Sequence, residues 1–68
     1  MKLSARNRLS GTVAEIHRGE AIANVAIDVG SQRLVASITT EAVEELGLRE
    51  GMSVTAVIKA SDVIVAAE

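Results

Sequence analysis

Hydrophobic and polar positions alternate along two neighbouring stretches of the chain. Residues 24–29 place valine or isoleucine at every second position, and residues 34–38 repeat the alternation after a turn signal at residues 30–32. A period of two is typical of a half-buried strand. Two such strands around a glycine-containing turn predict an antiparallel hairpin.

Three further stretches have strand character. Along residues 9–17 the apolar positions change from one face to the other, which predicts a strand with a bulge near Gly11. Residues 52–59 are rich in β-branched side chains and predict another strand. Residues 63–66 read Val-Ile-Val-Ala, without a polar position. A short run of this kind predicts a last strand that is buried on both faces.

A short helix is predicted between the third and fourth strands. Thr39 or Thr40 can cap its first turn, and Glu41 follows at a position where the helix dipole favours a carboxylate. Gly47 is suited to end the helix, because glycine adopts the left-handed conformation common after the last turn.

The pattern as a whole predicts three strands, a short helix and two strands. This order is typical of an all-β protein with one short helix, a five-stranded barrel related to the OB-fold, here as a single domain over residues 1–68. A barrel of five short strands has a thin core and open strand edges. Pairing with another copy relieves both problems, so we expect a homo-oligomer that shares strands and interfaces.

Composition also favours self-association. A chain of 68 residues buries only about 60% of its unfolded surface, and small domains compensate with disulfides, a metal ion or association. The chain has no Cys, no aromatic residue beyond one His, and no membrane-length apolar run.

The lack of cysteine is compatible with the cytoplasm, and residues 1–20 contain no apolar run of signal length. We therefore expect a cytoplasmic protein without a membrane partner.

Charge and side-chain chemistry disfavour two classes of function. Seven Lys and Arg against nine Asp and Glu give a net charge of -2, whereas a duplex-binding domain of this size normally carries a positive excess. The chain also has no Cys nucleophile, no His beside a Ser and an Asp, and no His/Cys metal spacing. His17, at a strand end, is interpreted as a solvated residue. We expect neither nucleic-acid binding, nor enzyme activity, nor a metal coordinated by the protein.

Two polar clusters each combine a cation with a hydroxyl group. They are Ser4-Ala5-Arg6-Asn7 and Lys59-Ala60-Ser61-Asp62. Arg and Lys donate hydrogen bonds and accept none, and turns present further backbone N–H groups. Converging donors of this kind favour a small, oxygen-rich anion. From the residues alone an alternative stays open, namely that these are ordinary surface charges and turn residues.

The runs SARNRLSGTV and SITTEAVEELGLREGMSVTAVIKASDVIVA closely resemble the molbindins, the small molybdate-binding proteins of the Mop family, which have a TOBE-type domain. The resemblance covers essentially the whole chain. It implies an OB-like barrel that assembles as a hexamer, a trimer of dimers, and binds molybdate or tungstate for intracellular molybdenum homeostasis. In the implied interface site, one chain contributes Ser4, Ala5 and Arg6, and a neighbour contributes Lys59, Ala60 and Ser61.

The resemblance also implies a second class of site near the three-fold axes, for which the turn Arg18-Gly19-Glu20 is the candidate. The family often has an apolar residue where Glu20 stands, so this chain departs from the pattern there. Molybdate is a tetrahedral dianion that only accepts hydrogen bonds, so donors can hold it without a bond to the metal and without a covalent cofactor. Asp62 is then expected to point away from the anion or to cap the adjoining backbone.

A second resemblance gives an alternative function. Residues 38–54 are also similar to the central part of AbrB-type swapped-hairpin transcription factors and antitoxins, which are dimeric DNA binders. This similarity covers a quarter of the chain and conflicts with the negative net charge. The sequence leaves open whether the ligand is molybdate or tungstate, and whether the protein stores the oxyanion or delivers it.

Overall fold

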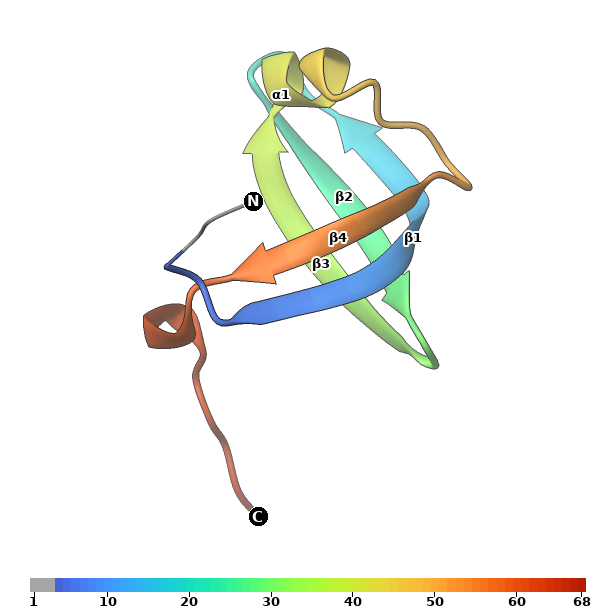
Figure 1. Ribbon diagram of the computed structural model, residues 1–68. Coiled ribbons are helices and arrows are strands. Elements are labelled where there is room, and N and C mark those ends of the chain that lie inside the picture. Colours follow the sequence, from blue (N-terminus) through green and yellow to red (C-terminus); the bar gives the residue numbers. More distant parts are fainter. Residues whose placement is uncertain (1–3) are drawn as a thin grey trace.

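The computed structural model describes residues 4–68 and shows a curled antiparallel sheet with a short helix at one end (Figure 1). Its elements are β1 (Asn7–Arg18), β2 (Ile22–Val29), β3 (Gln32–Thr39), α1 (Thr40–Glu45), β4 (Ser53–Ile58) and the 3-10 turn η1 (Ala60–Asp62). The strand order in the sheet is β3-β2-β1-β4. The predicted class, an all-β OB-like fold with one short helix, is therefore confirmed, while residues 1–3 of the predicted domain lie outside the described part.

The hairpin of β2 and β3 forms as the alternating pattern predicts. Val29 pairs with Gln32 across the turn, and Gly30 takes a φ of 61°. A positive φ is accessible to glycine at little cost because it has no Cβ. The eight-residue register between the strands then places Val25 opposite Ala36 and Ile27 opposite Leu34.

The predicted position of the bulge in β1 is wrong. The register of β1 against β2 shifts between Val13 and Glu15, not at Gly11. At this point β1 passes from its partner β4 to its partner β2, and the N–H and C=O groups of Val13 bond instead to Met52 and Gly51 at 2.9 and 2.8 Å. The change of partner explains the extra residue, which is a typical use of a bulge.

Gly11 serves another purpose in β1. A Cβ at this position would lie 2.6 Å from the backbone oxygen of Asp28 and 2.7 Å from Cγ2 of Ile27. The glycine therefore allows β1 and β2 to approach closely where the sheet curls.

Helix α1 begins and ends where the sequence predicts. The N–H of Ala42 donates to Oγ1 of Thr39 at 3.0 Å, which makes Thr39 the N-cap. Gly47 has a φ of 63° just after the helix, and the N–H of Leu48 donates to the carbonyl of Val43 at 3.0 Å. Both ends thus follow local signals. In the described part of the chain, no helix has the length and apolar character needed to cross a bilayer.

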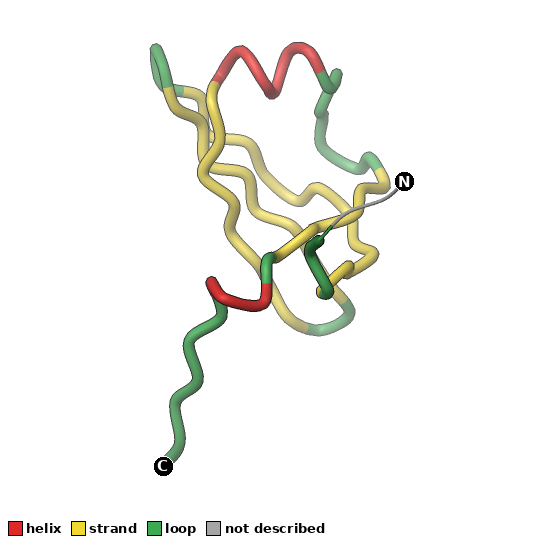
Figure 2. Tube along the Cα trace, turned by 60° about the vertical axis from the view of Figure 1, so that its left-hand side comes forward, coloured by secondary structure: helices red, strands yellow, loops and turns green. Residues whose placement is uncertain are grey.

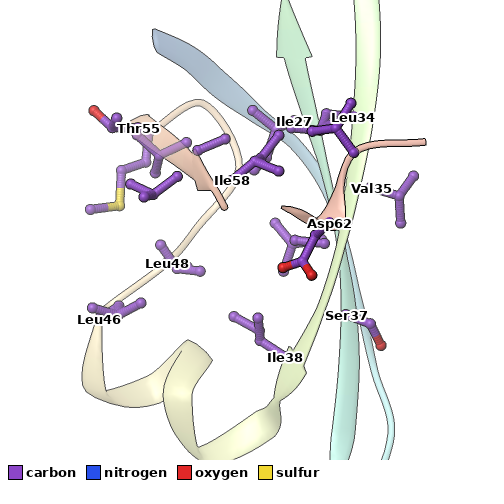
Figure 3. A pocket seen from close by; sticks show the side chains of 17 residues that line it. Ile27, Leu34, Val35, Ser37, Ile38, Leu46, Leu48, Thr55, Ile58 and Asp62 are labelled. Carbon is purple, nitrogen blue, oxygen red and sulfur yellow. The ribbon is translucent and has the colours of Figure 1, made fainter. Parts of the chain in front are cut away.

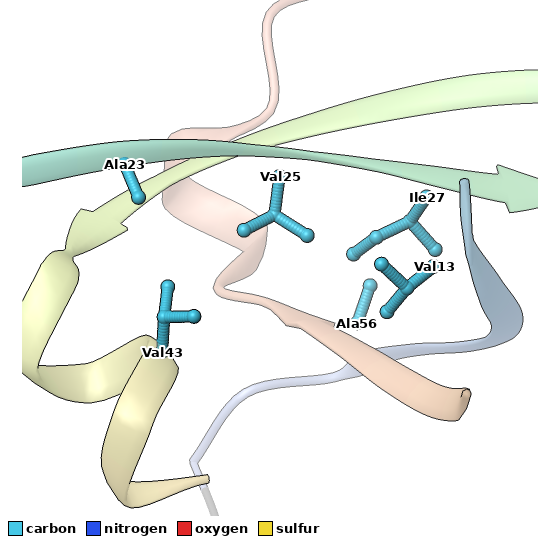
Figure 4. Close-up of a cluster of buried hydrophobic side chains, with 6 residues drawn as sticks. All are labelled: Val13, Ala23, Val25, Ile27, Val43 and Ala56. Carbon is cyan, nitrogen blue, oxygen red and sulfur yellow. The ribbon is translucent and has the colours of Figure 1, made fainter. Parts of the chain in front are cut away.

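The core lies inside the curled sheet, beneath α1 (Figure 4). Its buried members are all aliphatic: Val13, Ala23, Val25, Ile27, Val43 and Ala56. Val43 carries the contribution of α1 and is 0% exposed. The core is small because it contains no aromatic side chain, which agrees with the thin barrel expected from composition.

The predicted fifth strand is absent from the described chain. Residues 63–66 form no strand and pair with neither sheet edge, and they extend away from the body after η1 (Figures 1 and 2). Ile64 is 93% exposed and Val65 is 87% exposed, so the predicted burial on both faces is also wrong for the single chain. The physical reason is that η1 directs this segment away from its own sheet, where no strand is available to pair with it.

Candidate functional site

The two cation-hydroxyl clusters meet at one end of the β1–β4 pair. The ladder between these strands ends with Asn7 opposite Ile58, and Nδ2 of Asn7 donates to the carbonyl of Ile58 at 3.2 Å. Arg6 directly precedes β1, and Lys59 directly follows β4. The register therefore brings both clusters to the same end of the molecule, opposite the end that carries α1 (Figure 1). Asn7, predicted only as a possible donor, has a structural role here.

The side chains of this end are available to a ligand. Ser4, Arg6, Lys59, Ala60 and Ser61 are exposed, and Ala5 is half-buried. Within residues 4–68, no ion pair involves Arg6 or Lys59. Two cations without a carboxylate partner are a suitable environment for an anion, because their charge is not already neutralised.

The turn η1 adds backbone donors beside Lys59. The N–H of Asp62 donates to the carbonyl of Lys59 at 2.9 Å, and the N–H of Val63 donates to that of Ala60 at 3.2 Å. These bonds leave the N–H groups of Ala60 and Ser61 at the start of the turn, where such groups have no partner inside the turn. Backbone N–H groups next to an ammonium group fit an oxyanion.

Of the two roles that the sequence suggested for Asp62, the backbone cap is absent. The carboxylate of Asp62 makes no hydrogen bond to a backbone group in residues 4–68. Instead the side chain lines the apolar groove between β3 and β4 (Figure 3). The carboxylate thus belongs to the groove side of η1.

The second candidate, Arg18-Gly19-Glu20, lies at the far end of β1 from Arg6. All three residues are exposed, and the structure does not bring them to the first cluster. The carbonyl of Gly19 accepts a hydrogen bond from Oγ1 of Thr40 at 2.9 Å, and its N–H donates to the carbonyl of Ile22 at 2.9 Å. A Cβ at Gly19 would lie 2.7 Å from that oxygen, so glycine is needed here.

Sequence reasoning missed the contribution of Thr40. It treated Thr40 only as an alternative cap, whereas Thr39 caps α1 and Thr40 fastens α1 to the turn at Gly19 through its hydroxyl. The N–H of Thr40 adds a bond to the carbonyl of Ala21 at 2.9 Å. No local signal indicates these contacts, because their partners are about 20 residues away in the chain.

Glu15, His17, Asp28 and Arg33 form a solvated group on β1, β2 and β3. Nε2 of His17 lies 3.2 Å from Oε2 of Glu15, and Nε of Arg33 donates to Oδ1 of Asp28 at 3.1 Å. The side chain of His17 is 75% exposed, which confirms its interpretation as a solvated strand-end residue. Such exposed pairs contribute little to stability. In residues 4–68, no group of His, Cys, Asp or Glu has a metal-binding arrangement.

Comparison with known proteins identifies the family. The TOBE domain matches residues 3–65. The chain belongs to the TOBE domain family. A curated member of similar length, Molybdenum-pterin-binding protein 1 of Clostridium pasteurianum, is 41% identical over 98% of this chain and 100% of its own length. The resemblance to the Mop proteins is thereby confirmed.

Two solved structures of the family share the fold. A molybdate-binding protein from Sporomusa ovata is 42% identical and superimposes with a TM-score of 0.95 over 98% of this chain and 100% of its own. The cytoplasmic molybdate-binding protein ModG, solved with molybdate bound, is 48% identical with a TM-score of 0.89 over 94% of this chain and 46% of its own. The AbrB-type interpretation is wrong, because residues 38–54 belong to the same OB-like sheet and its helix rather than to a swapped hairpin.

Proposed function

We propose that this protein binds molybdate or tungstate without catalysing a reaction, and that it serves intracellular storage or homeostasis of molybdenum. The observation that carries the proposal is the meeting of two donor clusters at one end of the β1–β4 pair, with no carboxylate paired to Arg6 or Lys59 in residues 4–68. The family relatives named for molybdenum-pterin or molybdate binding support it.

Each residue of the proposed site has a chemical role. Arg6 supplies a planar guanidinium and Lys59 an ammonium group, while Ser4 and Ser61 supply hydroxyl donors. Ala5 and Ala60 supply backbone N–H groups. Molybdate and tungstate accept hydrogen bonds and donate none at neutral pH, so this donor set matches them.

We further propose that copies of the chain complete one another's sites. On a single chain the donors are exposed, and water weakens their attraction for an anion. A neighbouring copy that covers them lowers the local dielectric and brings a second set of donors. The proposed assembly is a hexamer, a trimer of dimers, of a cytoplasmic single-domain protein over residues 1–68, with the turn Arg18-Gly19-Glu20 as a second class of site.

Calorimetric titration of the assembled protein tests the proposal. Molybdate and tungstate are expected to bind, and phosphate and sulfate, titrated under the same conditions, provide the comparison of charge and size. Absence of heat with both molybdate and tungstate, from protein with the expected circular dichroism spectrum, would refute the function.

A further inference from the structure

The last pair of the β1–β4 ladder carries a side-chain hydrogen bond in addition to its backbone pairing. Asn7 lies opposite Ile58, and Nδ2 of Asn7 donates to the carbonyl of Ile58 at 3.2 Å. Both residues are half-buried, so water competes less for this bond than for an exposed one. Within residues 4–68, no other side-chain hydrogen bond or ion pair joins β1 to β4. The Asn7 bond therefore closes the ladder at an end where strand pairs otherwise open.

The Asn7 bond lies next to both cations of the candidate site. Arg6 directly precedes Asn7, and Lys59 directly follows Ile58 (Figure 1). Neither Arg6 nor Lys59 belongs to a strand, so no ladder bond holds its backbone. The last pair of the ladder is therefore the fixed point from which both cations project.

The bond also orients the peptide group that joins Ile58 to Lys59. A peptide unit is planar, and in its usual trans form the C=O and N–H groups point in opposite directions. Because Asn7 holds the carbonyl of Ile58, it sets the direction of the N–H of Lys59 and the position of the Cα that follows.

The peptide group on the other side of Lys59 is held within η1. The N–H of Asp62 donates to the carbonyl of Lys59 at 2.9 Å. Both peptide groups that flank the Cα of Lys59 are thus hydrogen-bonded, one to the Asn7 side chain and one to the Asp62 backbone. The φ of -67° and ψ of 132° at Lys59 are ordinary extended values. The direction in which the lysine side chain leaves the backbone is therefore fixed without strain.

Fixed donor positions affect which oxyanion is bound. Sulfate and molybdate are both tetrahedral dianions that accept hydrogen bonds, so charge does not distinguish them, but sulfate is smaller. Donors on a mobile backbone close around either anion, whereas donors at fixed positions fit one size better than the other. Mobile donors must also be ordered on binding, which lowers the affinity.

We propose that Asn7 is a positioning residue that sets the size of the oxyanion that the site accepts. It acts through the backbone of Arg6 and Lys59 in its own chain. In a site shared between copies, the Arg6 of one copy and the Lys59 of the other are each held by the Asn7 of their own chain. This inference rests on the proposed function, and it identifies the residue that favours molybdate and tungstate over sulfate.

The variants Asn7→Ala and Asn7→Val test the proposal, because both remove the donor to Ile58. Valine also favours a strand, so Asn7→Val keeps the fold where alanine weakens it. The matched controls are Asn24→Ala and Asn24→Val. Asn24 is an exposed residue of β2, and its side chain makes no hydrogen bond within residues 4–68. Circular dichroism and light scattering coupled to size exclusion establish that each variant has the wild-type fold and mass.

Equilibrium dialysis measures molybdate binding, and displacement of molybdate by sulfate gives the sulfate affinity. We expect both Asn7 variants to bind molybdate roughly two- to tenfold more weakly, the range for one lost neutral hydrogen bond. Sulfate binding should fall less or rise. The ratio of the sulfate to the molybdate dissociation constant is thus expected to decrease at least about twofold in the Asn7 variants and to stay unchanged in the Asn24 variants. A loss of stability alone does not change this ratio, since the unfolded chain has no site for either anion.

The outcomes separate this inference from the proposed function. If the wild type binds neither molybdate nor tungstate, both fail. If the wild type binds molybdate and a folded Asn7 variant keeps the wild-type ratio, only the role of Asn7 is refuted, even where both affinities fall by the same factor.

Nuclear magnetic resonance on the wild type gives a measurement that does not depend on the folding of a variant. The side-chain amide protons of Asn7 should exchange with water several times more slowly than those of Asn24, because only Asn7 donates a side-chain hydrogen bond in the described chain. Equal exchange rates would mean that Asn7 does not hold the carbonyl of Ile58, which contradicts the proposal.

Discussion

Arg6 and Lys59 are the two residues whose charges carry the proposed function. Arg6 directly precedes Asn7, the first paired residue of β1, and Lys59 directly follows Ile58, the last paired residue of β4. The side chains of Arg6 and Lys59 have no carboxylate partner in the described chain. Their value for binding comes from charge and from donor geometry together. Arg and Lys differ in geometry, because only the guanidinium presents a rigid fork of donors.

We expect Arg6→Ala and Lys59→Ala each to weaken molybdate binding at least about tenfold, because a hydrogen bond to a charged group contributes roughly 1.5 to 3 kcal/mol. Arg6→Lys should recover only part of the loss. The control is Arg49→Ala, which removes an exposed cation from the loop after α1. Calorimetric titration measures all four variants, and unchanged affinity in both alanine variants at Arg6 and Lys59 would place the site elsewhere.

Gly11 gives a second prediction for a single residue, and it concerns the free energy of unfolding. In Gly11→Ala the new Cβ meets the backbone of Asp28 at 2.6 Å, which a strand cannot accommodate without shifting. We expect a loss of roughly 1 to 3 kcal/mol in the free energy of unfolding, the range for overpacked sites. Urea unfolding followed by circular dichroism measures it. Ser10→Ala, on the neighbouring exposed position of β1, should change little.

Among the elements, those set by neighbours in the chain were predictable and those set by distant partners were not. The hairpin of β2 and β3 and the helix α1 follow from alternation, a glycine turn and a threonine cap, all within a few residues. The predicted position of the bulge was wrong because the bulge arises where β1 changes its pairing partner from β4 to β2. At that point Val13 is bonded to Gly51 and Met52, which are distant in the sequence. The prediction of a fifth strand is wrong, because residues 63–66 leave the sheet after η1 and pair with neither of its edges.

The features of the candidate site also divide into those that nearby sequence predicts and those that depend on distant partners. Both donor clusters were predictable as residue types, and the resemblance to the Mop proteins gave them a ligand. Their meeting at one end of the sheet depends on the register Asn7 to Ile58, which joins positions 51 residues apart. The contact of Thr40 with Gly19 escaped prediction for the same reason.

The cap of α1 provides a test at the scale of the element. Thr39→Ala removes the acceptor for the N–H of Ala42, and we expect the free energy of unfolding to fall by about 1 kcal/mol, as for other N-caps. Thr39→Ser keeps the hydroxyl group and should retain most of the stability. Thermal unfolding followed by circular dichroism compares the two, and equal losses would mean that the methyl group rather than the cap matters.

For the whole molecule, the central question is how the two donor clusters combine between copies. The register places them side by side at one end of a single chain, while the proposed sites are shared between chains. A mixed assembly distinguishes the two cases. Arg6→Ala and Lys59→Ala chains each lack one cation in every site, but an interface between unlike chains can contain both intact residues.

We therefore expect refolded mixtures of Arg6→Ala and Lys59→Ala chains to regain part of the molybdate binding that each parent has lost. Equilibrium dialysis at a fixed molybdate concentration measures the recovery, and mass spectrometry of the intact assembly confirms that the chains have mixed. If each site were formed within one chain, every site would still lack a cation. A mixed assembly that binds no better than its parents would then exclude shared sites.

The turn η1 connects two parts of the chain that have different roles. On one side it continues from Lys59 and presents donors at Ala60 and Ser61, and on the other side it directs residues 63–66 away from their own sheet. A ligand that fixes this turn therefore also fixes the direction of residues 63–66. Binding that occurs only in the assembled state stabilises that state by mass action, by about 2.7 kcal/mol when the free ligand is at 100 times its dissociation constant. The supply of oxyanion in the cell would then regulate how many copies of the chain are held together.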